Sequence, residues 1–292
     1  QDYMDMALAI QQVTEEIVFR LCASAKKKTN CRYLVLAGGV ALNSVANGKI
    51  LKSGMFDDLW IQPAAGDAGG AVGAAYAVWH IHAKKERKVT PGRDAMKGAF
   101  LGPEFSDREI QKTLDRYQAV TRHYEDSGDL ARDVAARMAE GNVVGWFQGR
   151  MEFGPRALGN RSILGDARNP EMQKKMNLKI KYREGFRPFA PTVIEEDIGK
   201  HFEIDRPSPY MLLVADVKKE RQIRVESQRG IPMRERINQV RSDVPAITHV
   251  DFSARIQTVD GVDNPGFFAI LSAFERQTGC GVLINTSFNV RG

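Results

Sequence analysis

Residues 148–162 concentrate side chains that could bind an anion. Arginine offers a planar fork of donors that matches phosphate or carboxylate oxygens, and glycine lets backbone N–H groups approach a ligand closely. An apolar run at 143–147 precedes them and is typical of a buried strand. We therefore predict an anion pocket at the end of this strand, formed by Arg150, Arg156 and Arg161. The alternative is a solvated turn in which the arginines pair with Glu152 and Asp166.

Two later stretches add donors of the same kind. A loop at 181–191 carries Lys181 and Arg187, and its prolines hold the backbone extended, although a rigid surface loop is the alternative. Arg255 lies in a strand-like segment at 254–259 and should point away from the face of its apolar neighbours. A strand at 281–284 leads into a second predicted oxyanion-binding turn, whose amides and hydroxyls belong to Asn285, Thr286, Ser287 and Asn289.

The first third of the chain offers two weaker signals. The double glycine Gly38 and Gly39 separates a strand at 33–37 from a helical pattern at 40–51, as in nucleotide-binding turns, although such turns also use glycine for structure alone. Asp67 follows a strand at 58–63 among small residues. Its carboxylate suits Mg²⁺ beside phosphates, or merely starts the next helix.

Bulk properties limit the class of protein. With 292 residues the chain is long enough for two domains, and 43% hydrophobic and 27% charged residues are ordinary for a soluble globular protein. No apolar run approaches bilayer length and no secretory signal is present. Three scattered cysteines favour structural thiols in the cytoplasm. The net charge of +6 is partly diffuse, which is weak evidence for nucleic acid.

Hydrophobic periodicity predicts the remaining elements. Helices are expected at 2–28, 72–84, 107–117, 127–140, 170–180 and 265–278, and further strands at 120–124, 210–217 and 246–251. A charged stretch with Pro91 and Gly92 predicts a linker at 89–98 between domains at 1–88 and 99–292.

The motifs GGVALN, QPAAGDAGGAVGAA, GRMEFGPRALGNRSIL, KYREGFRPFAP, THVDFSARIQTV and LINTSFNVRG, in this order, resemble the NodU/CmcH-type O-carbamoyltransferases. The resemblance covers nearly the whole chain. It implies an α/β fold in which a partial ASKHA (Kae1-like) lobe is followed by a YrdC-like α/β domain with a twisted mixed sheet. Because NTSFNVRG is usually followed by an acidic Glu-Pro, the second domain is expected to be truncated at its end.

The resemblance also implies an activity. Such enzymes use ATP and carbamoyl phosphate: the YrdC-like domain makes carbamoyl-adenylate, and the Kae1-like domain transfers the carbamoyl group to a substrate hydroxyl. On matching positions, carbamoyl-phosphate contacts are implied for Lys181, Arg187, Arg255 and Ser287, and nucleotide or phosphate contacts for Arg156, Asn285 and Thr286. Gly38, Gly39 and Asn43 would face the nucleotide in the Kae1-like part, and Asp67 matches a metal-ligand aspartate.

Cofactors and partners follow from the same resemblance. Mg²⁺ is expected with ATP, and Fe²⁺ is an alternative metal in a complete Kae1-like site, whose HxxxH pair this chain lacks. The partner is a small hydroxyl acceptor, with no membrane, no nucleic acid and a homodimer left open. Alternative functions are a threonylcarbamoyl-adenylate synthase of tRNA modification, or a non-catalytic nucleotide- or RNA-binding module. RNA readers usually expose aromatic stacking platforms, and no such cluster stands out.

Overall fold

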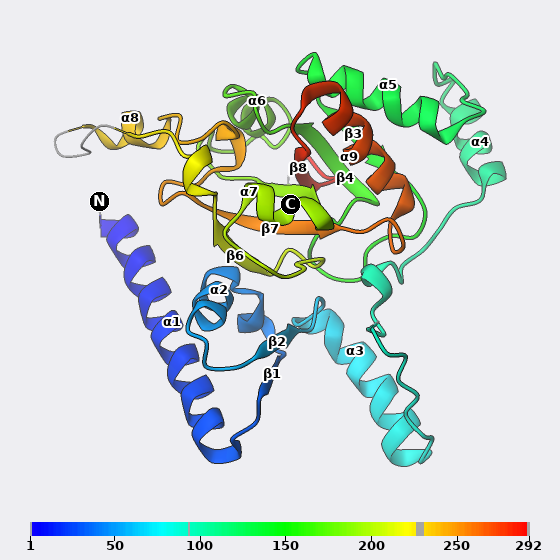
Figure 1. The fold of residues 1–292 in the computed structure, drawn as a ribbon. Coiled ribbons are helices and arrows are strands. Elements are labelled where there is room, and N and C mark those ends of the chain that lie inside the picture. The colour runs from blue at the N-terminus through cyan, green and yellow to red at the C-terminus, as the bar shows by residue number, and fades with distance from the viewer. Residues whose placement is uncertain (1, 93, 226–230, 291–292) are drawn as a thin grey trace. The chain divides into compact units, whose positions relative to one another are not determined.

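The computed structural model describes residues 2–92, 94–225 and 231–290 (Figure 1). The chain forms two compact units. The first consists of Gln1–Gly92 with Leu212–Val214, and the second of Arg93–Met211 with Ala215–Gly292. No helix in the described ranges is long and apolar enough to span a bilayer.

The first unit is built around a short parallel pair of strands. Its elements are α1 (Asp2–Thr29), β1 (Tyr33–Leu36), a 3₁₀ turn (Gly39–Leu42), α2 (Ser44–Lys52), β2 (Asp58–Ile61), α3 (Asp67–Tyr76) and a π-helical turn (Ala77–His82). Strands β1 and β2 pair from Tyr33 opposite Asp58 to Leu36 opposite Ile61. A small core of Cys22, Ile50 and Phe56 joins the helices to this pair.

The second unit contains a six-stranded sheet and its helices. In chain order the elements are α4 (Asp107–Arg116), α5 (Ser127–Ala139), β3 (Val144–Phe147), β4 (Arg161–Asp166), α6 (Met172–Lys179), β5 (Ala190–Ile194), α7 (Ile198–His201), β6 (Leu213–Asp216), α8 (Met233–Ile237), β7 (Ser253–Val259), α9 (Pro265–Thr278) and β8 (Val282–Ser287). Short 3₁₀ turns lie at Lys97–Ala99, Glu195–Asp197, Lys219–Arg221 and Pro245–Ile247.

The sheet is mixed, with strand order β3-β4-β8-β5-β7-β6. Strands β5 and β7 run parallel, whereas β3–β4, β4–β8 and β8–β5 are antiparallel. Strands β4, β5 and β7 therefore begin at the edge of the sheet where β3 and β8 end. The candidate site lies where β8 ends and β4, β5 and β7 begin.

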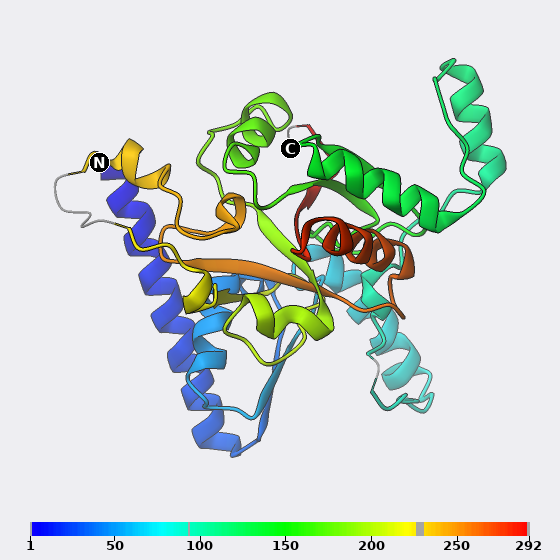
Figure 2. The ribbon, with the colours of Figure 1, turned by 45° about the horizontal axis from the view of Figure 1, so that its top comes forward.

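Each face of the sheet packs its own core. Helices α5 and α9 contact each other over one face, with Phe267 and Leu283 fully buried there (Figures 1 and 2). The other face packs against α6, with Met176 and Ile284 fully buried. Alternation along a strand sends successive side chains to opposite faces, so the odd-numbered positions of β7 and β8 face the α5–α9 side.

Local signals explain where the major helices begin. Helix α4 has a complete capping box between Ser106 and Glu109, and Asp126 caps α5. Asn264 caps α9, Pro265 follows at its first position, and Gly279 ends it in the left-handed conformation. These helices match their sequence predictions to within a residue or two.

Four predictions of local structure are wrong. Residues 120–124 are irregular, since Val120 is fully exposed and has no strand to pair with. Residues 246–251 form the end of a 3₁₀ turn and the start of a second turn, not a strand. The predicted turn at 285–287 is the continuation of β8, paired with β4 and β5. Arg161 and Ser162, expected in a loop, begin β4.

Candidate anion site at one edge of the sheet

Four segments of the second unit meet at the edge where β8 ends. They are the β3–β4 connection at 148–160, the loop at 180–189 that leads into β5, the start of β7, and residues 285–289. The β4–β8 register places Ser162 opposite Ser287, and the β5–β8 register places Ala190 opposite Asn285. The cationic and polar stretches predicted from the sequence thus converge on one edge.

Lys181 connects two of these segments directly. Its Nζ donates to the backbone oxygen of Ser287 at 2.5 Å and to the side-chain oxygen of Asn289 at 2.7 Å, and it also contacts the Ser287 hydroxyl at 3.3 Å and the Asn289 carbonyl at 2.9 Å. Only 5% of the residue is exposed. Burial, together with the charge of Arg183, lowers the pKa of Lys181 to about 8.

Arg255 is a cation held among other cations. Burial, together with the charges of Arg156 and Arg183, lowers the pKa of Arg255 to about 10. Its Nε is buried without a hydrogen-bond partner, and no carboxylate of the described residues pairs with its guanidinium. Burial also lowers the pKa of Arg156. A phosphoryl group is the kind of ligand that would neutralise this arrangement.

A buried amide network fixes the backbone beside Arg156. Gln257 donates from Nε2 to the Leu158 carbonyl at 2.8 Å, and Asn285 donates from Nδ2 to the Ala157 carbonyl at 3.1 Å. The Asn285 amide also donates to Gln257 Oε1, and so does the Thr192 hydroxyl, each at 2.7 Å. Asn285 Oδ1 is a buried acceptor with no partner among the described residues.

The other two predicted arginines of residues 148–162 bind the chain itself. Arg161 donates to the carbonyls of Gln148 and Gly149, and also of Pro103 and Asn160, while its guanidinium lies 3.5 Å from the centre of the Phe147 ring. Arg150 donates to the Gly102 carbonyl. These contacts hold the β3–β4 connection in place. A ligand role for Arg150 or Arg161 stays a prediction.

Glu152 shapes the same connection from inside. It is buried, and its Oε1 accepts from the backbone N–H groups of Leu158 at 2.7 Å, Asn160 at 2.9 Å and Arg161 at 3.3 Å. The alternative prediction paired the arginines with Glu152; in the structure its Oε1 binds backbone donors that would otherwise be buried without a partner.

Two residues at the edge were missed by the sequence predictions. Arg183 lies in the loop with Lys181 and Arg187, and its charge acts on both Lys181 and Arg255. His249 lies in the turn before β7, where its Nδ1 is 3.2 Å from the Ser253 hydroxyl. Burial lowers the pKa of His249, with Arg255 acting in the same direction. The only signal in the sequence was their place inside the charged motifs.

Arg187 and Ser287 complete the predicted set. Arg187 is exposed and its Nε pairs with Glu184 at 2.8 Å. The Ser287 hydroxyl donates to Asn289 Oδ1 at 2.7 Å. Thr286, one position earlier, lies opposite Ile163 of β4.

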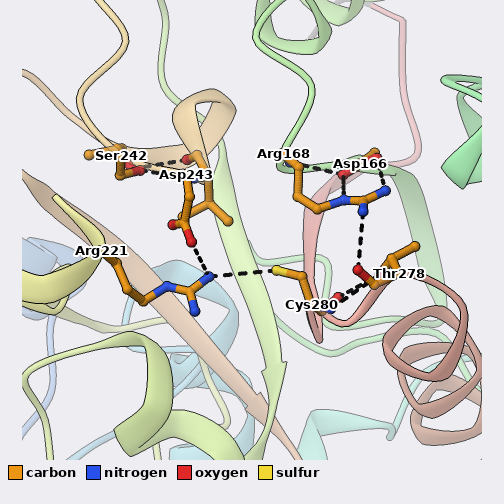
Figure 3. Close-up of polar contacts among 9 residues, drawn as sticks. Asp166, Arg168, Arg221, Ser242, Asp243, Thr278 and Cys280 are labelled. Carbon is orange, nitrogen blue, oxygen red and sulfur yellow. Dashed lines mark hydrogen bonds and ion pairs between the residues drawn. The ribbon is translucent and has the colours of Figure 1, made fainter. Parts of the chain in front are cut away.

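The opposite edge of the sheet treats its arginines differently (Figure 3). Arg168 contacts both carboxylate oxygens of Asp166, through Nε at 3.0 Å and Nη2 at 2.8 Å, and Arg221 pairs with Asp243 at 2.9 Å. Arg221 also approaches the Cys280 sulfur at 3.7 Å. Here Arg168 and Arg221 are neutralised by the protein's own carboxylates, whereas Arg255 forms no ion pair with a carboxylate among the described residues.

The candidates of the first unit lie at the starts of helices. Gly38 adopts a φ of 97°, in the region that favours glycine, and precedes the 3₁₀ turn with Gly39. Asn43 caps α2 by accepting from the Ala46 N–H at 3.1 Å. Asp67 is the first residue of α3. Across the described residues no three His, Cys, Asp or Glu side chains are grouped to hold a metal ion.

Comparison with known proteins decides the family. A family model described as carbamoyltransferase C-terminus matches residues 135–292, and one described as carbamoyltransferase N-terminus matches residues 1–76. The chain belongs to the carbamoyltransferase family. The resemblance found in the motifs is thereby confirmed.

Individual carbamoyltransferase relatives agree with this assignment. The chain is 56% identical to the uncharacterized protein sll1178 of Synechocystis over 298 residues, which cover 100% of the chain and 48% of that protein. It is 40% identical to the nodulation protein NolO of Bradyrhizobium diazoefficiens over 294 residues (99% and 49%). It is 35% identical to the 3'-hydroxymethylcephem-O-carbamoyltransferase of Streptomyces clavuligerus over 259 residues (89% and 43%). The chain spans about half the length of the curated relatives it matches.

Proposed function

We propose that this chain is a portion of an ATP-dependent O-carbamoyltransferase. Its residues 99–292 form a YrdC-like domain that makes carbamoyl-adenylate from carbamoyl phosphate and ATP. Residues 1–88 belong to a Kae1-like (ASKHA) domain that transfers the carbamoyl group to a substrate hydroxyl, and 89–98 link the two. Family membership supports this proposal, as does the name of the cephem relative.

The observation that carries the proposal is the group of cations at one edge of the sheet. The charge of Arg183 lowers the pKa of both Lys181 and Arg255, and among the described residues no ion pair with a carboxylate is formed by any of these three cations. Holding cations together in this way costs stability in the absence of a ligand. A phosphorylated substrate neutralises these cations when it binds and so removes their repulsion, which increases the affinity of the site for an anion.

The balanced reaction needs positioning and neutralisation of charge. Water converts carbamoyl phosphate to carbamate and inorganic phosphate. A carbamate oxygen then attacks the α-phosphorus of ATP, forming carbamoyl-adenylate and releasing pyrophosphate. Attack by the acceptor hydroxyl on the carbamoyl carbon gives the O-carbamate and AMP. Fixed arginine and lysine donors stabilise the phosphoryl charges in each step and need not exchange protons.

Roles for individual residues follow from their place at the edge. We assign carbamoyl-phosphate contacts to Lys181, Arg187, Arg255 and Ser287, and nucleotide contacts to Arg156, Asn285 and Thr286. The amide network holds Arg156 through the carbonyls of residues 157 and 158. Gly38, Gly39 and Asn43 are assigned to the nucleotide in the first unit. Mg²⁺ would enter with ATP.

The remaining parts of the proposal concern the setting of the enzyme. The acceptor is a small hydroxyl compound, the location is the cytoplasm, and neither a membrane nor a nucleic acid takes part. A homodimer is compatible with this setting.

One assay tests the proposed function. The chain, alone and joined to the preceding half of its NolO relative, is incubated with Mg²⁺, ATP and carbamoyl phosphate labelled in the carbamoyl group. We expect labelled carbamoyl-adenylate and pyrophosphate. We expect Arg255→Ala and Arg187→Ala to abolish product formation while the circular dichroism spectrum stays unchanged. Wild-type turnover in a soluble Arg255→Ala variant would refute the assigned role of that arginine.

The two alternatives give different outcomes in the same assay. Formation of threonylcarbamoyl-adenylate from bicarbonate and threonine would replace the proposal with the tRNA-modification function. Retention of RNA without either adenylate would replace it with a binding module.

A further inference from the structure

The first turn of α9 packs closely against the β3–β4 connection. Gly159 of the connection lies so near Phe267 that an added Cβ would be 2.2 Å from its ring. At Gly266, an added Cβ would lie 2.3 Å from the side-chain oxygen of Gln148, the residue that follows β3. Because only glycine leaves this space open, α9 and the connection meet closely at two points.

Three amide side chains join the same two elements. Gln148 Nε2 donates to Asn264 Oδ1 at 2.7 Å and to Asn160 Oδ1 at 2.9 Å, and Asn264 Nδ2 donates to Asn160 Oδ1 at 3.0 Å. Asn160 and Asn264 are each only 6% exposed. Since a buried amide is costly unless its donors and acceptors are paired, each of the three side chains holds the others in one orientation.

Asn264 has two tasks in this arrangement. It is the N-cap of α9, and its Oδ1 accepts from the Phe267 N–H at 3.2 Å. A cap needs only a short acceptor, so serine, threonine or aspartate would serve equally well. The Nδ2 group of Asn264 takes no part in the cap and instead binds Asn160 of the connection. This second contact explains why an amide occupies the cap position.

Asn160 passes the restraint on to the backbone of the connection. Its Nδ2 donates to the Arg150 carbonyl at 2.7 Å, and its backbone N–H donates to Glu152 Oε1 at 2.9 Å. The carbonyls of residues 157 and 158 accept from the buried amide network that belongs to the strands. Arg156 lies between these points, so buried side chains hold the backbone on both sides of it.

We propose that Asn264 is a positioning residue for the nucleotide, which fixes the β3–β4 connection through Asn160 and so sets the place of Arg156. The nucleotide contact of Arg156 rests on the proposed function. Asn264 itself is buried among groups of the protein and acts through the backbone of the connection. An arginine on a fixed backbone loses less conformational freedom when it binds a phosphate than one on a mobile loop, which increases affinity.

Binding measurements on the 292-residue chain test this role. Affinities for ATP with Mg²⁺ and for carbamoyl phosphate are measured by calorimetry for wild type and Asn264→Ser. Serine keeps an acceptor for the cap of α9 but has no amide to reach Asn160. We expect Asn264→Ser to bind ATP about tenfold more weakly, with the affinity for carbamoyl phosphate little changed.

The matched control is Asp126→Ser at the N-cap of α5. Asp126 Oδ1 accepts from the N–H groups of Gly128 and Asp129 of its own helix, so this variant changes a cap without touching the connection. It should bind both ligands like wild type. An equal loss of ATP affinity in Asp126→Ser and Asn264→Ser, or no loss in Asn264→Ser, would overturn the proposal.

A double-mutant cycle tests whether Asn264 acts through Arg156. Arg156→Met should weaken ATP binding, and Asn264→Ser should have little further effect in that background. Equal losses from Asn264→Ser in the wild type and in Arg156→Met would show that the two residues act separately, and would overturn the positioning role.

Hydrogen exchange gives a readout that needs no ligand. The backbone N–H groups of Leu158 and Asn160 both bind Glu152, and they should exchange at least about tenfold faster in Asn264→Ser than in wild type or Asp126→Ser. Unchanged exchange in Asn264→Ser would mean that the connection does not depend on Asn264, and would overturn the inference whatever ligand the chain binds.

The outcomes also separate this inference from the proposed function. Carbamoyl-adenylate formation that is unaffected by Asn264→Ser leaves the function standing and removes the role of Asn264. Faster exchange in Asn264→Ser, in a chain whose wild type makes no carbamoyl-adenylate, keeps Asn264 as the residue that fixes the connection and removes the function.

Discussion

Replacing Arg255 by methionine should stabilise the ligand-free protein while removing its affinity for phosphate. Arg255 is largely buried beside two other arginine charges, and its pKa is lowered to about 10. The lowered pKa means that the charged guanidinium destabilises the folded protein. This destabilisation is fully present below pH 10 and fades only as pH rises above 10, so it applies in full at neutral pH.

The magnitude follows from the pKa values. One pKa unit corresponds to about 1.36 kcal/mol, so the lowering of the Arg255 pKa to about 10 corresponds to about 3 kcal/mol. Part of the side chain is exposed, and screening by solvent reduces this figure to about 1–2 kcal/mol. Methionine keeps the apolar stem of arginine and removes the charge. We therefore expect the free energy of unfolding to rise by about 1 kcal/mol.

The assay is urea unfolding with and without carbamoyl phosphate. Trp146 of β3 reports on the second unit once Trp60 and Trp79, which lie in the first, are changed to phenylalanine. At a ligand concentration one hundred times the dissociation constant, the wild type should gain about 2.7 kcal/mol. Arg255→Met should gain almost nothing.

A paired arginine at the other edge provides the matched control. Arg168→Met removes the partner of Asp166, which is buried, and should destabilise the protein by about 3 kcal/mol without changing the ligand effect. Replacing arginine by methionine is thus expected to raise the free energy of unfolding at position 255 and to lower it at position 168. A loss of stability in Arg255→Met that matches Arg168→Met, with the stabilisation by carbamoyl phosphate retained, would show that Arg255 is a structural residue.

Three further predictions concern stability. His201 is buried, neither of its ring nitrogens has a hydrogen-bond partner among the described residues, and burial lowers its pKa to about 4. The stability that the neutral imidazole contributes is therefore lost as pH falls below 6.5. His201→Leu should remove about 2 kcal/mol of the difference in unfolding free energy between pH 7 and pH 5. Glu152→Ala leaves three backbone N–H groups without their acceptor and should cost about 3 kcal/mol in urea unfolding, with Glu152→Gln costing less because it keeps an acceptor. Gly159→Ala should lower the melting temperature strongly, at a cost of about 3 kcal/mol, because φ is +112° and the new Cβ would lie 2.2 Å from Cδ1 of Phe267; unchanged melting would contradict the backbone geometry.

Strong local signals made most helices of this chain predictable. Capping residues and a 3.6-residue period mark α4, α5 and α9 without help from tertiary structure. Strands were harder, because a strand exists only through its partners. Residues 120–124 carry a plausible pattern but no neighbour, whereas β5 contains Pro191 and still pairs with β7 and β8 in the middle of the sheet. In both cases the presence or absence of a neighbouring strand, and not the local sequence preference, decided whether a strand formed.

The same limit applies to the candidate site: the sequence indicates which residue types are present, but not which partners they contact. The charged motifs predicted an anion site, which stays a prediction, but they did not indicate which arginines are occupied by the protein itself. Arg161 and Arg150 donate to backbone carbonyls, while Arg183 donates from Nε to Asn177. Asn177 carried no signal at all, since an asparagine on a helix looks ordinary until the loop folds back onto it.

The contacts of Lys181 suggest a division of labour among the cations. An ammonium group has three donors, and in the ligand-free protein four oxygen atoms of Ser287 and Asn289 surround it. Lys181 can therefore bind an anion only by exchanging one of these partners, so its first task is to hold the end of β8 against the loop. Arg255 has no such partner in the described chain, and Arg183 uses only Nε on Asn177. Under the proposed function, the arginines therefore receive the phosphoryl group directly, while Lys181 holds the end of β8 against the loop that carries it.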